Sequence, residues 1–176
     1  MFISRVLSHF QQSLCKSICS IASPVHKTAK VLTTTSNTVY ENLAIEDWLF
    51  ENFNSLNCNR LLLMWRSDPC VVIGKFQNQW LECDLSYMRQ NSMQLCRRRS
   101  GGGAVYHDTG NVNMSFITRR EDYNRRENLG LVSAALTDIW PQLNLSINCR
   151  DDLLLDGKLK VCPPGRQFPI PYLNEV

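Results

Sequence analysis

The sequence predicts an α+β fold with a mixed, mainly antiparallel sheet and flanking helices. Short apolar segments of strand length follow one another along the chain, separated by turn-forming residues. Only a few segments carry apolar residues at helical spacing. Hydrophobic residues form 44% of the 176 residues and charged residues 20%, so a buried core can form. Strands joined as hairpins and interrupted by a few helices favour this class over a doubly wound parallel sheet.

The first predicted elements are one helix and two strands. Thr38 and Glu41 have the spacing of a capping box, which starts a helix. Apolar residues follow at helical spacing and predict an amphipathic helix that buries Ile45, Trp48, Leu49 and Phe53. The apolar runs 61–65 and 70–73 are separated by turn-forming residues, and they predict two buried strands of a hairpin.

The next segments continue this mixture of helices and strands. Residues 84–90 predict a short helix, and residues 95–99 and 112–116 predict strands on either side of a glycine-rich segment. A longer helix that ends before Pro141 is predicted from Leu129, Val132, Leu136 and Ile139. Alternating apolar residues over 143–149 predict a further strand.

The last regular element is predicted to be a tight hairpin. Asp156-Gly157 separates the apolar segments 153–155 and 158–161, and this dipeptide favours a type I′ turn, which needs positive φ at both central residues. Residues 162–176 contain four prolines, which cannot donate sheet hydrogen bonds. The sequence therefore predicts an unpacked tail after residue 161.

The N-terminal 35 residues have the composition of a mitochondrial transit peptide. They are rich in Ser and Thr, and they hold four basic residues and no acidic one. They predict the mitochondrial matrix as the location, whereas polar residues interrupt the apolar core that a secretory signal needs. The alternative is an N-terminus that is merely disordered. The rest of the chain holds 15 basic and 16 acidic residues, which gives no electrostatic case for nucleic acid.

Two other classes of protein are disfavoured by the composition. No stretch of about 20 apolar residues is present, so the sequence predicts no membrane span. The eight cysteines include no Cys-x-x-Cys pair, so they are interpreted as small buried hydrophobic residues and no bound metal is predicted.

The segment Arg97–Asp108 is the strongest candidate site. It places three arginines and then three glycines between two apolar strands. Glycines let backbone N–H groups converge on an anion and arginine offers a bidentate fork, so the segment predicts phosphate recognition. A flexible loop beside solvated arginines is the alternative. The segment lacks the endings of P-loop and dinucleotide motifs, and His107-Asp108 is interpreted as structural.

This segment, extended to Asn113, resembles the signature of lipoate–protein ligases and lipoyltransferases. Residues 42–47, 71–80 and 150–160 agree with the same family in order and spacing. The resemblance covers residues 38–161. Together with the leader, it points to the mitochondrial lipoyltransferase branch.

The resemblance implies a biotin/lipoate-ligase-like catalytic domain. Such a domain binds lipoyl-AMP and passes the lipoyl group to a lysine of the lipoyl domain of 2-oxoacid dehydrogenase E2 subunits, or acts with the glycine-cleavage H protein. A monomer is implied, with no metal, nucleic acid or membrane. The implied lipoyl-AMP-binding residues are Arg98, Ser100, Gly101, Gly102, Gly103, Ala104, Val105, Tyr106, Arg150 and Lys160. Lys160 is also the implied catalytic residue, and the alternative is a solvent-facing hairpin lysine like Lys158.

The sequence departs from the family directly after the hairpin. The family continues with Ser-Gly-x-Ala and further strands, whereas here Lys160 is followed by Val161, Cys162 and Pro163. We therefore expect a leader over 1–35, an incomplete, C-terminally truncated catalytic domain over 36–161, and a divergent tail over 162–176. The alternative to a lipoyltransferase is an inactive truncated isoform that only binds nucleotide or an E2 partner.

Overall fold

The structure is a computed structural model that describes residues 12, 29–53, 60–162 and 167–170. The chain divides into two compact units. We call residues 33–53 and 63–115 the glycine-loop unit, and residues 1–32, 54–62 and 116–176 the hairpin unit. Each unit is described by itself.

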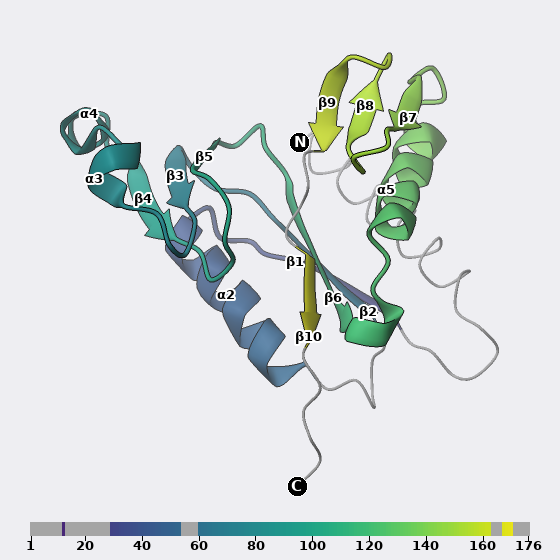
Figure 1. The fold of residues 1–176 in the computed structure, drawn as a ribbon, viewed down its shortest axis with the longest axis horizontal. Coiled ribbons are helices and arrows are strands. Elements are labelled where there is room, and N and C mark those ends of the chain that lie inside the picture. Colours follow the sequence, from purple (N-terminus) through teal and green to yellow (C-terminus); the bar gives the residue numbers. More distant parts are fainter. Residues whose placement is uncertain (1–11, 13–28, 54–59, 163–166, 171–176) are drawn as a thin grey trace, which may run out of the picture. The chain divides into compact units, whose positions relative to one another are not determined.

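Runs of strands are separated by a few helices along the chain, as Figure 1 shows. The elements in order are β1 (Ala29–Thr33), α2 (Val39–Asn52), β2 (Arg60–Trp65), β3 (Cys70–Ile73), α3 (Gln79–Glu82), α4 (Leu85–Gln90), β4 (Gln94–Arg97), β5 (Val105–His107), β6 (Asn113–Arg119), the short 3₁₀ helix η1 (Arg120–Asp122), α5 (Arg125–Ile139), β7 (Leu145–Ile147), β8 (Leu153–Leu155), β9 (Leu159–Cys162) and β10 (Gln167–Ile170). In the part of the chain that the structure describes, no helix has the length and apolar character needed to cross a membrane.

The strands form three sheets, in the orders β1-β2-β6-β10, β4-β3-β5 and β7-β8-β9. In the second sheet, β3 runs parallel to β4 and antiparallel to β5. The third sheet is antiparallel throughout. The predicted α+β class with a mixed, antiparallel-rich sheet is therefore confirmed.

Helix α2 begins where the sequence predicts but buries a different face. Thr38 is the N-cap residue, yet its side chain makes no capping bond. The Val39 N–H instead donates to Oε1 of Gln94 on β4, at 3.1 Å. Trp48 of the predicted buried stripe is 62% exposed and Ile45 38% exposed. The buried residues of the helix are Val39, Asn42, Leu43 and Glu46.

Two polar side chains can lie on the buried face of α2 because their hydrogen bonds are provided there. Asn42 donates through Nδ2 to the carbonyl oxygen of Arg66 at 2.7 Å. Oε2 of Glu46 accepts from Trp65 Nε1 at 3.1 Å and from Ser115 Oγ at 2.5 Å. A buried polar group is tolerated when it is hydrogen-bonded. The spacing of apolar residues alone therefore predicted the wrong buried face for α2.

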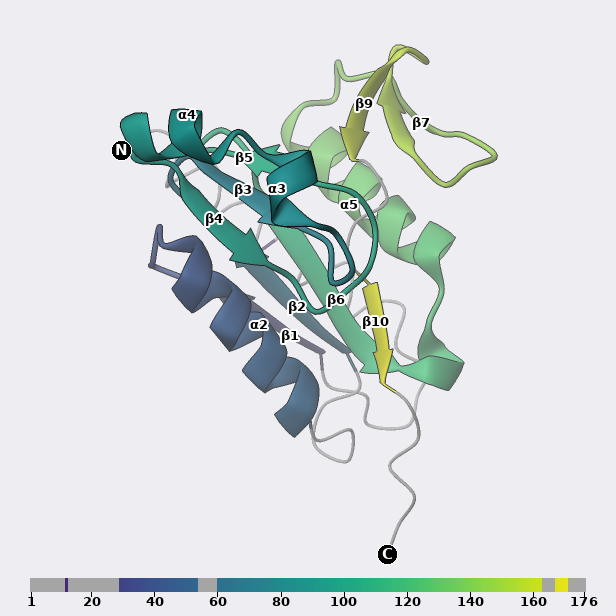
Figure 2. The same ribbon diagram turned by 60° about the vertical axis from the view of Figure 1, so that its left-hand side comes forward.

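The predicted hairpin of β2 and β3 is wrong, because the two strands belong to different sheets. The turn residues between them bind the N-terminal end of α2 instead of closing a two-stranded ladder. Asn42 holds the Arg66 carbonyl, and the Asp68 N–H donates to the Asn37 carbonyl at 2.8 Å. Figure 2 shows α2 running along β4 in this unit.

The helices predicted at residues 84–90 and before Pro141 are confirmed. Helix α4 starts behind Asp84, whose Oδ1 accepts from the N–H groups of Ser86 and Tyr87. Helix α5 starts behind Asn124 and ends at Ile139, two residues before Pro141. Helix α5 buries much of its predicted apolar stripe, including Leu129 and Val132.

The hairpin of β8 and β9 is confirmed, together with its turn. Asp156 has φ 53° and Gly157 has φ 68°, and the Lys158 N–H donates to the Leu155 carbonyl at 3.1 Å. Positive φ at both central residues is the type I′ geometry. The register shifts between Leu153 and Leu154, so the ladder is irregular beyond the turn.

The structure contains a strand in the predicted tail and another in the predicted leader. Gln167–Ile170 form β10, which pairs in parallel with β6, where the sequence predicted no regular element. The strand lies at the end of its sheet, where a proline such as Pro169 is tolerated. Ala29–Thr33 of the predicted leader form β1. Residues 1–11 and 13–28 of the predicted leader, and residues 163–166 and 171–176, lie outside the described residues.

Candidate functional site

The glycine loop, Ser100–Ala104, joins β4 to β5 in the glycine-loop unit. Ser100 is half-buried, and the three glycines and Ala104 are exposed. Gly102 has φ 93°, which favours glycine. The N–H groups of the three glycines donate to no acceptor within the described residues. Exposed N–H groups of consecutive loop residues are available to an anion.

The Arg98 side chain holds the glycine loop through hydrogen bonds to the loop carbonyls. The residue is 8% exposed. Its Nη2 donates to the carbonyl oxygens of Gly103 at 2.7 Å and Gly101 at 2.9 Å. Its Nε donates to Gly101 at 3.0 Å, and its Nη1 to the Val72 carbonyl at 3.3 Å. The guanidinium therefore orients the loop carbonyls inwards, and in this structure its fork is engaged by the backbone.

The two neighbouring arginines also bind within the unit. Nη1 of Arg97 donates to the carbonyl oxygens of Gly74 at 3.0 Å, Lys75 at 3.2 Å and Gln77 at 2.7 Å. Arg99 pairs with Glu51 at 2.5 Å. Arg97 and Arg98 thus bind backbone carbonyls, whereas Arg99 pairs with a carboxylate.

A second loop, residues 74–78, lies against the glycine loop. The Lys75 N–H donates to the Ser100 carbonyl at 3.0 Å. A Cβ added at Gly74 would stand 2.0 Å from the Gly102 carbonyl oxygen, so only glycine permits this approach. The Gly74 N–H donates to Gln77 Oε1 at 2.8 Å. These contacts were not predicted, although residues 74–78 lie in one of the segments that resemble the ligase family.

Strand β5 continues the site with two exposed side chains and one buried one. Val105 is 39% exposed and Tyr106 52% exposed. His107 is buried with its ring against Trp65, at 5.9 Å between ring centroids, and its Nδ1 lies 2.7 Å from Asn111 Nδ2. This packing is a structural role for His107.

Lys160 on β9 is an exposed cation among the predicted site residues of the hairpin unit. Its Nζ lies 3.0 Å from Oδ2 of Asp152, and the side chains are 56% and 4% exposed, respectively. Asn148 Nδ2 donates to the same oxygen at 3.1 Å. The hydrogen bond from Lys160 and then that from Asn148 lower the pKa of the Asp152 carboxyl.

Asn148 also organises the loop that carries Arg150. Its Oδ1 accepts from the N–H groups of Arg150 and Asp152, each at 2.9 Å. Asp151 has φ 54°, a left-handed conformation that Asp tolerates better than most residues. The Arg150 side chain is exposed, and it makes no hydrogen bond or ion pair within the part of the chain that the structure describes.

The predicted site residues therefore fall into two groups. Arg98 to Tyr106 belong to the glycine-loop unit, and Arg150 and Lys160 to the hairpin unit. Within the described ranges, no group of three or more His, Cys, Asp and Glu side chains could hold a metal ion.

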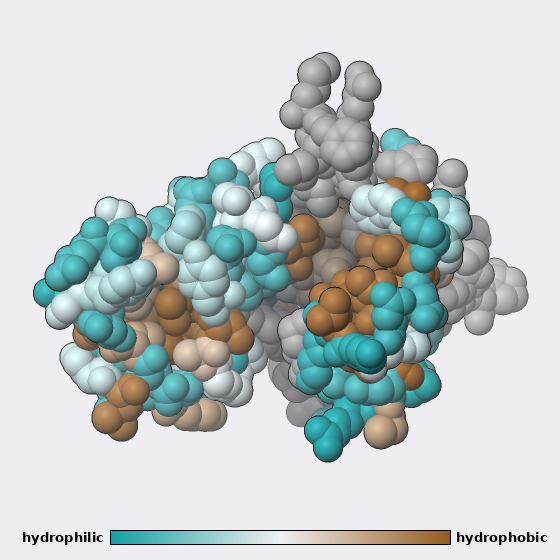
Figure 3. Space-filling view, turned by 90° about the horizontal axis from the view of Figure 1, so that it is seen from above, coloured by the Kyte–Doolittle hydropathy of each residue, from teal (hydrophilic) through white to brown (hydrophobic). Residues whose placement is uncertain are grey.

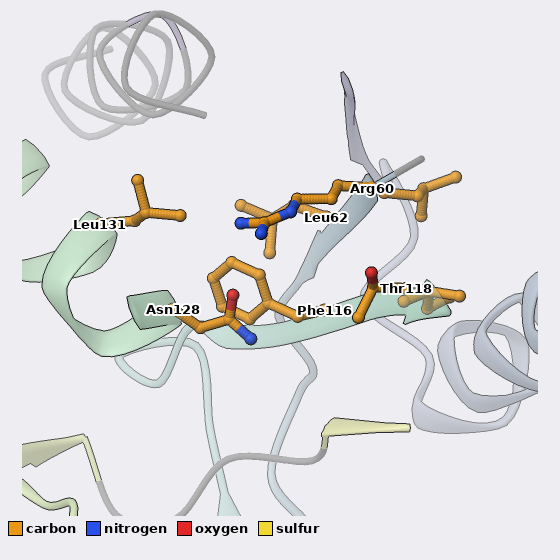
Figure 4. Close-up of a pocket in the computed structure, with 8 residues that line it drawn as sticks. Arg60, Leu62, Phe116, Thr118, Asn128 and Leu131 are labelled. Atoms are coloured by element: carbon orange, nitrogen blue, oxygen red, sulfur yellow. The ribbon is translucent and has the colours of Figure 1, made fainter. Parts of the chain in front are cut away.

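The hairpin unit also has a pocket, which is lined by none of the predicted site residues. Figure 4 shows it lined by Leu131 and Asn128 of α5 and by side chains from β2 and β6. Its empty space of about 250 Å³ includes open solvent. Sites for drug-sized ligands occupy about 300–1,000 Å³. Because the enclosed part of the pocket is smaller than about 250 Å³, the pocket lies below the size of such sites.

Apolar side chains also reach the surface, as the brown areas of Figure 3 show. In the glycine-loop unit the most exposed of the large ones are Phe76 at 86%, Leu81 at 83% and Trp80 at 72%. All three follow β3, in the 74–78 loop and helix α3.

Comparison with known proteins agrees with this arrangement of motifs. The human mitochondrial lipoyl amidotransferase LIPT1 is 45% identical over 165 residues, which cover 92% of this chain and 43% of the relative. A putative lipoate-protein ligase A of Schizosaccharomyces pombe is 38% identical, covering 72% of this chain and 34% of the relative. The chain thus spans less than half the length of these curated relatives.

Solved structures show the same likeness. LipL1 of P. falciparum, solved in complex with lipoate, matches with a TM-score of 0.65 and 29% identity over 73% of this chain and 41% of that chain. The bipartite lipoate protein ligase of Thermoplasma acidophilum, described with its E2 lipoyl domain, matches with a TM-score of 0.61 and 28% identity, covering 74% and 52%. Residues 38–165 match the lipoyl protein ligase A/B catalytic domain, and the chain belongs to this family.

Proposed function

We propose that this chain is a lipoyltransferase. It moves a lipoyl group from an activated donor, lipoyl-AMP or lipoyl-H protein, to a lysine of the lipoyl domain of a 2-oxoacid dehydrogenase E2 subunit. The observation that carries the proposal is the glycine loop, whose exposed N–H groups are held in place by Arg98. Family membership supports the same chemistry.

In this proposal the glycine loop binds the phosphate of lipoyl-AMP. The N–H groups of Gly101 to Gly103 donate to phosphate oxygens, and Ser100, Ala104, Val105 and Tyr106 line the nucleotide. The charge of Arg98 acts through the loop, because its donors are already taken by loop carbonyls. A preorganised loop needs no rearrangement when the ligand arrives.

Lys160 and Arg150 supply exposed positive charge for the transfer step. The ε-amine of the acceptor lysine attacks the acyl carbonyl, a C–N bond forms, and the bond from the acyl carbon to the phosphate oxygen breaks. AMP carries away the electron pair, and the amine proton is released to solvent. Fixed cations stabilise the carbonyl oxygen and the departing phosphate as both become more negative. Lys160 is the catalytic residue in this scheme.

The names of the relatives support a location in mitochondria, and we propose the matrix. Residues 1–35 would be the transit peptide, and the protein would act as a monomer on E2 lipoyl domains. The structural relative described with its E2 lipoyl domain supports this class of partner.

A direct transfer assay tests the proposal. The chain is incubated with lipoyl-AMP and an isolated lipoyl domain, and the domain's intact mass is followed over time. We expect a gain of one lipoyl group, absent when the domain's acceptor lysine is replaced by arginine. A rate equal to that of the lipoyl domain without the chain would reject transferase activity. If a non-hydrolysable lipoyl-AMP analogue still raised the melting temperature, the chain would be a binding protein of the same ligand class.

A further inference from the structure

The hairpin unit contains a buried carboxylate that faces an exposed lysine. Asp152 is 3% exposed, and its Oδ2 lies 3.0 Å from the Lys160 ammonium. We propose that Asp152 is the positioning residue for Lys160 and holds its ammonium where the acyl group is transferred. This inference rests on the proposed function, because it assigns how that reaction's cation is placed.

The pairing is asymmetric, and this asymmetry suits a positioning role. A carboxylate without a partner is costly to bury, so Asp152 holds its cation strongly. The Lys160 side chain remains 56% exposed. An ammonium has three N–H donors, and the contact with Asp152 uses one of them, which leaves two for a ligand.

The carboxylate is itself fixed by the loop before β8. Oδ1 of Asn148 accepts from the Asp152 N–H at 2.9 Å. Nδ2 of Asn148 donates to Oδ2 of Asp152 at 3.1 Å. The Asn148 N–H donates to the Asp152 carbonyl at 3.1 Å. Three hydrogen bonds between two residues leave the carboxylate little freedom.

Two arginines at the start of α5 anchor the same loop. Nη2 of Arg125 donates to the Asp151 carbonyl at 3.0 Å. Nη1 of Arg126 lies 3.3 Å from both the Asn148 carbonyl and Oδ1 of Asp151. Helix α5 thus anchors the loop, and Asn148 of that loop binds the carboxylate that holds Lys160.

The hairpin provides its own comparison. Lys158 is exposed in the type I′ turn, and its side chain makes no ion pair within the described residues. Lys160 pairs with Leu154 in the ladder, just past the register shift. Such irregularities re-aim side chains. Two lysines in one hairpin therefore differ in whether a carboxylate fixes them.

A double-mutant cycle tests the inference in the transfer assay. Asp152→Asn is expected to lower the single-turnover rate about 10- to 100-fold, because misplacement of a catalytic group by about 1 Å can cost about 100-fold. The KM for the lipoyl domain is expected to stay the same. In the Lys160→Ala background, Asp152→Asn should lower the rate less than about twofold further, since both changes remove one interaction. Asp156→Asn and Lys158→Ala are the matched controls, with rates within about twofold of wild type.

A second measurement separates the contact from the function. The Asp152 carboxyl is titrated by NMR in the wild type and in Lys160→Ala, and its pKa should rise in the variant because the largest cause of its lowering is removed. An unchanged pKa would overturn the inference. Equal losses of rate from Asp152→Asn in both backgrounds would also overturn it, since they would mean a general structural role. If the wild type transferred nothing while the titration still depended on Lys160, the proposed function would fail and the pair would be structural only.

Discussion

The two units hold their candidate site cations in opposite ways. In the glycine-loop unit, Arg98 is 8% exposed and its guanidinium donates to backbone carbonyls. In the hairpin unit, the Lys160 side chain is 56% exposed and meets a single buried carboxylate. Arg98 fixes the backbone of the glycine loop, whereas Lys160 remains accessible to a ligand.

The difference follows from the chemistry of the two side chains. A planar guanidinium has five fixed donors and can hold several carbonyls at once, whereas an ammonium is a compact charge on a flexible stem. Arginine therefore suits a loop that has to be held in one conformation. Lysine suits a position where the charge has to approach a reacting group, provided that something fixes it.

The largest expected effect concerns the contact between the two loops of the glycine-loop unit. Gly74→Ala places a methyl group 2.0 Å from the Gly102 carbonyl oxygen, where backbone on both sides has to move. We expect a loss of about 3 kcal/mol in the free energy of unfolding, at the upper end for overpacked sites. Gly103→Ala is the control, because its Cβ would meet nothing within 4 Å. Equal urea midpoints for the two variants would show that the loops are not locked together.

The second prediction tests whether Arg98 is structural. Arg98→Met removes charged hydrogen bonds to three carbonyls and is expected to cost about 2–3 kcal/mol of unfolding free energy. Chemical denaturation measures this loss. If stability were unchanged while binding of a lipoyl-AMP analogue was lost, Arg98 would face the phosphate directly, and the contrast between the two cations would disappear.

The third prediction concerns pH and the other cation. Hydrogen bonds from Lys160 and then Asn148 lower the pKa of Asp152 in the folded state. The stabilisation is therefore fully present above the ordinary Asp pKa of about 3.9, and it is lost as the pH falls through the lower folded pKa. The difference in unfolding free energy between wild type and Asp152→Asn should shrink between about pH 5 and pH 2. A difference that is constant over this range would contradict the lowered pKa.

The smallest expected effect comes from the neighbouring exposed arginine. Arg99→Ala breaks the pair with Glu51, whose partners are 42% and 58% exposed. Surface pairs contribute about 0–1 kcal/mol, and salt screens them. We expect a melting temperature within about 2 °C of wild type for Arg99→Ala. A loss as large as that of Arg98→Met would mean that burial does not distinguish the arginines of this segment.

Local signals predicted much of the fold. The end of α5 before Pro141 and the turn at Asp156-Gly157 were predictable because proline and turn residues act over two or three positions. The strand after residue 166 was missed, because proline suits an edge strand and sheet position is a tertiary property.

The candidate site was predicted as residues but not as geometry. The sequence showed arginines beside glycines, but not that Arg98 would donate to those glycines' carbonyls. The partner of Lys160 lies eight residues upstream and is brought close by the hairpin. Asn42 and Glu46 were missed as core residues for a similar reason, since their partners come from other segments.

The edge position of β10 also bears on how copies of this chain meet. An open sheet edge offers a row of N–H and C=O groups to another strand, which is a route to aggregation. Pro169 has no N–H to donate, and it is the third residue of a strand of only four. A short strand interrupted by proline is a poor template for a further strand. A proline in a short edge strand is one of the features by which proteins discourage pairing of that edge with another chain.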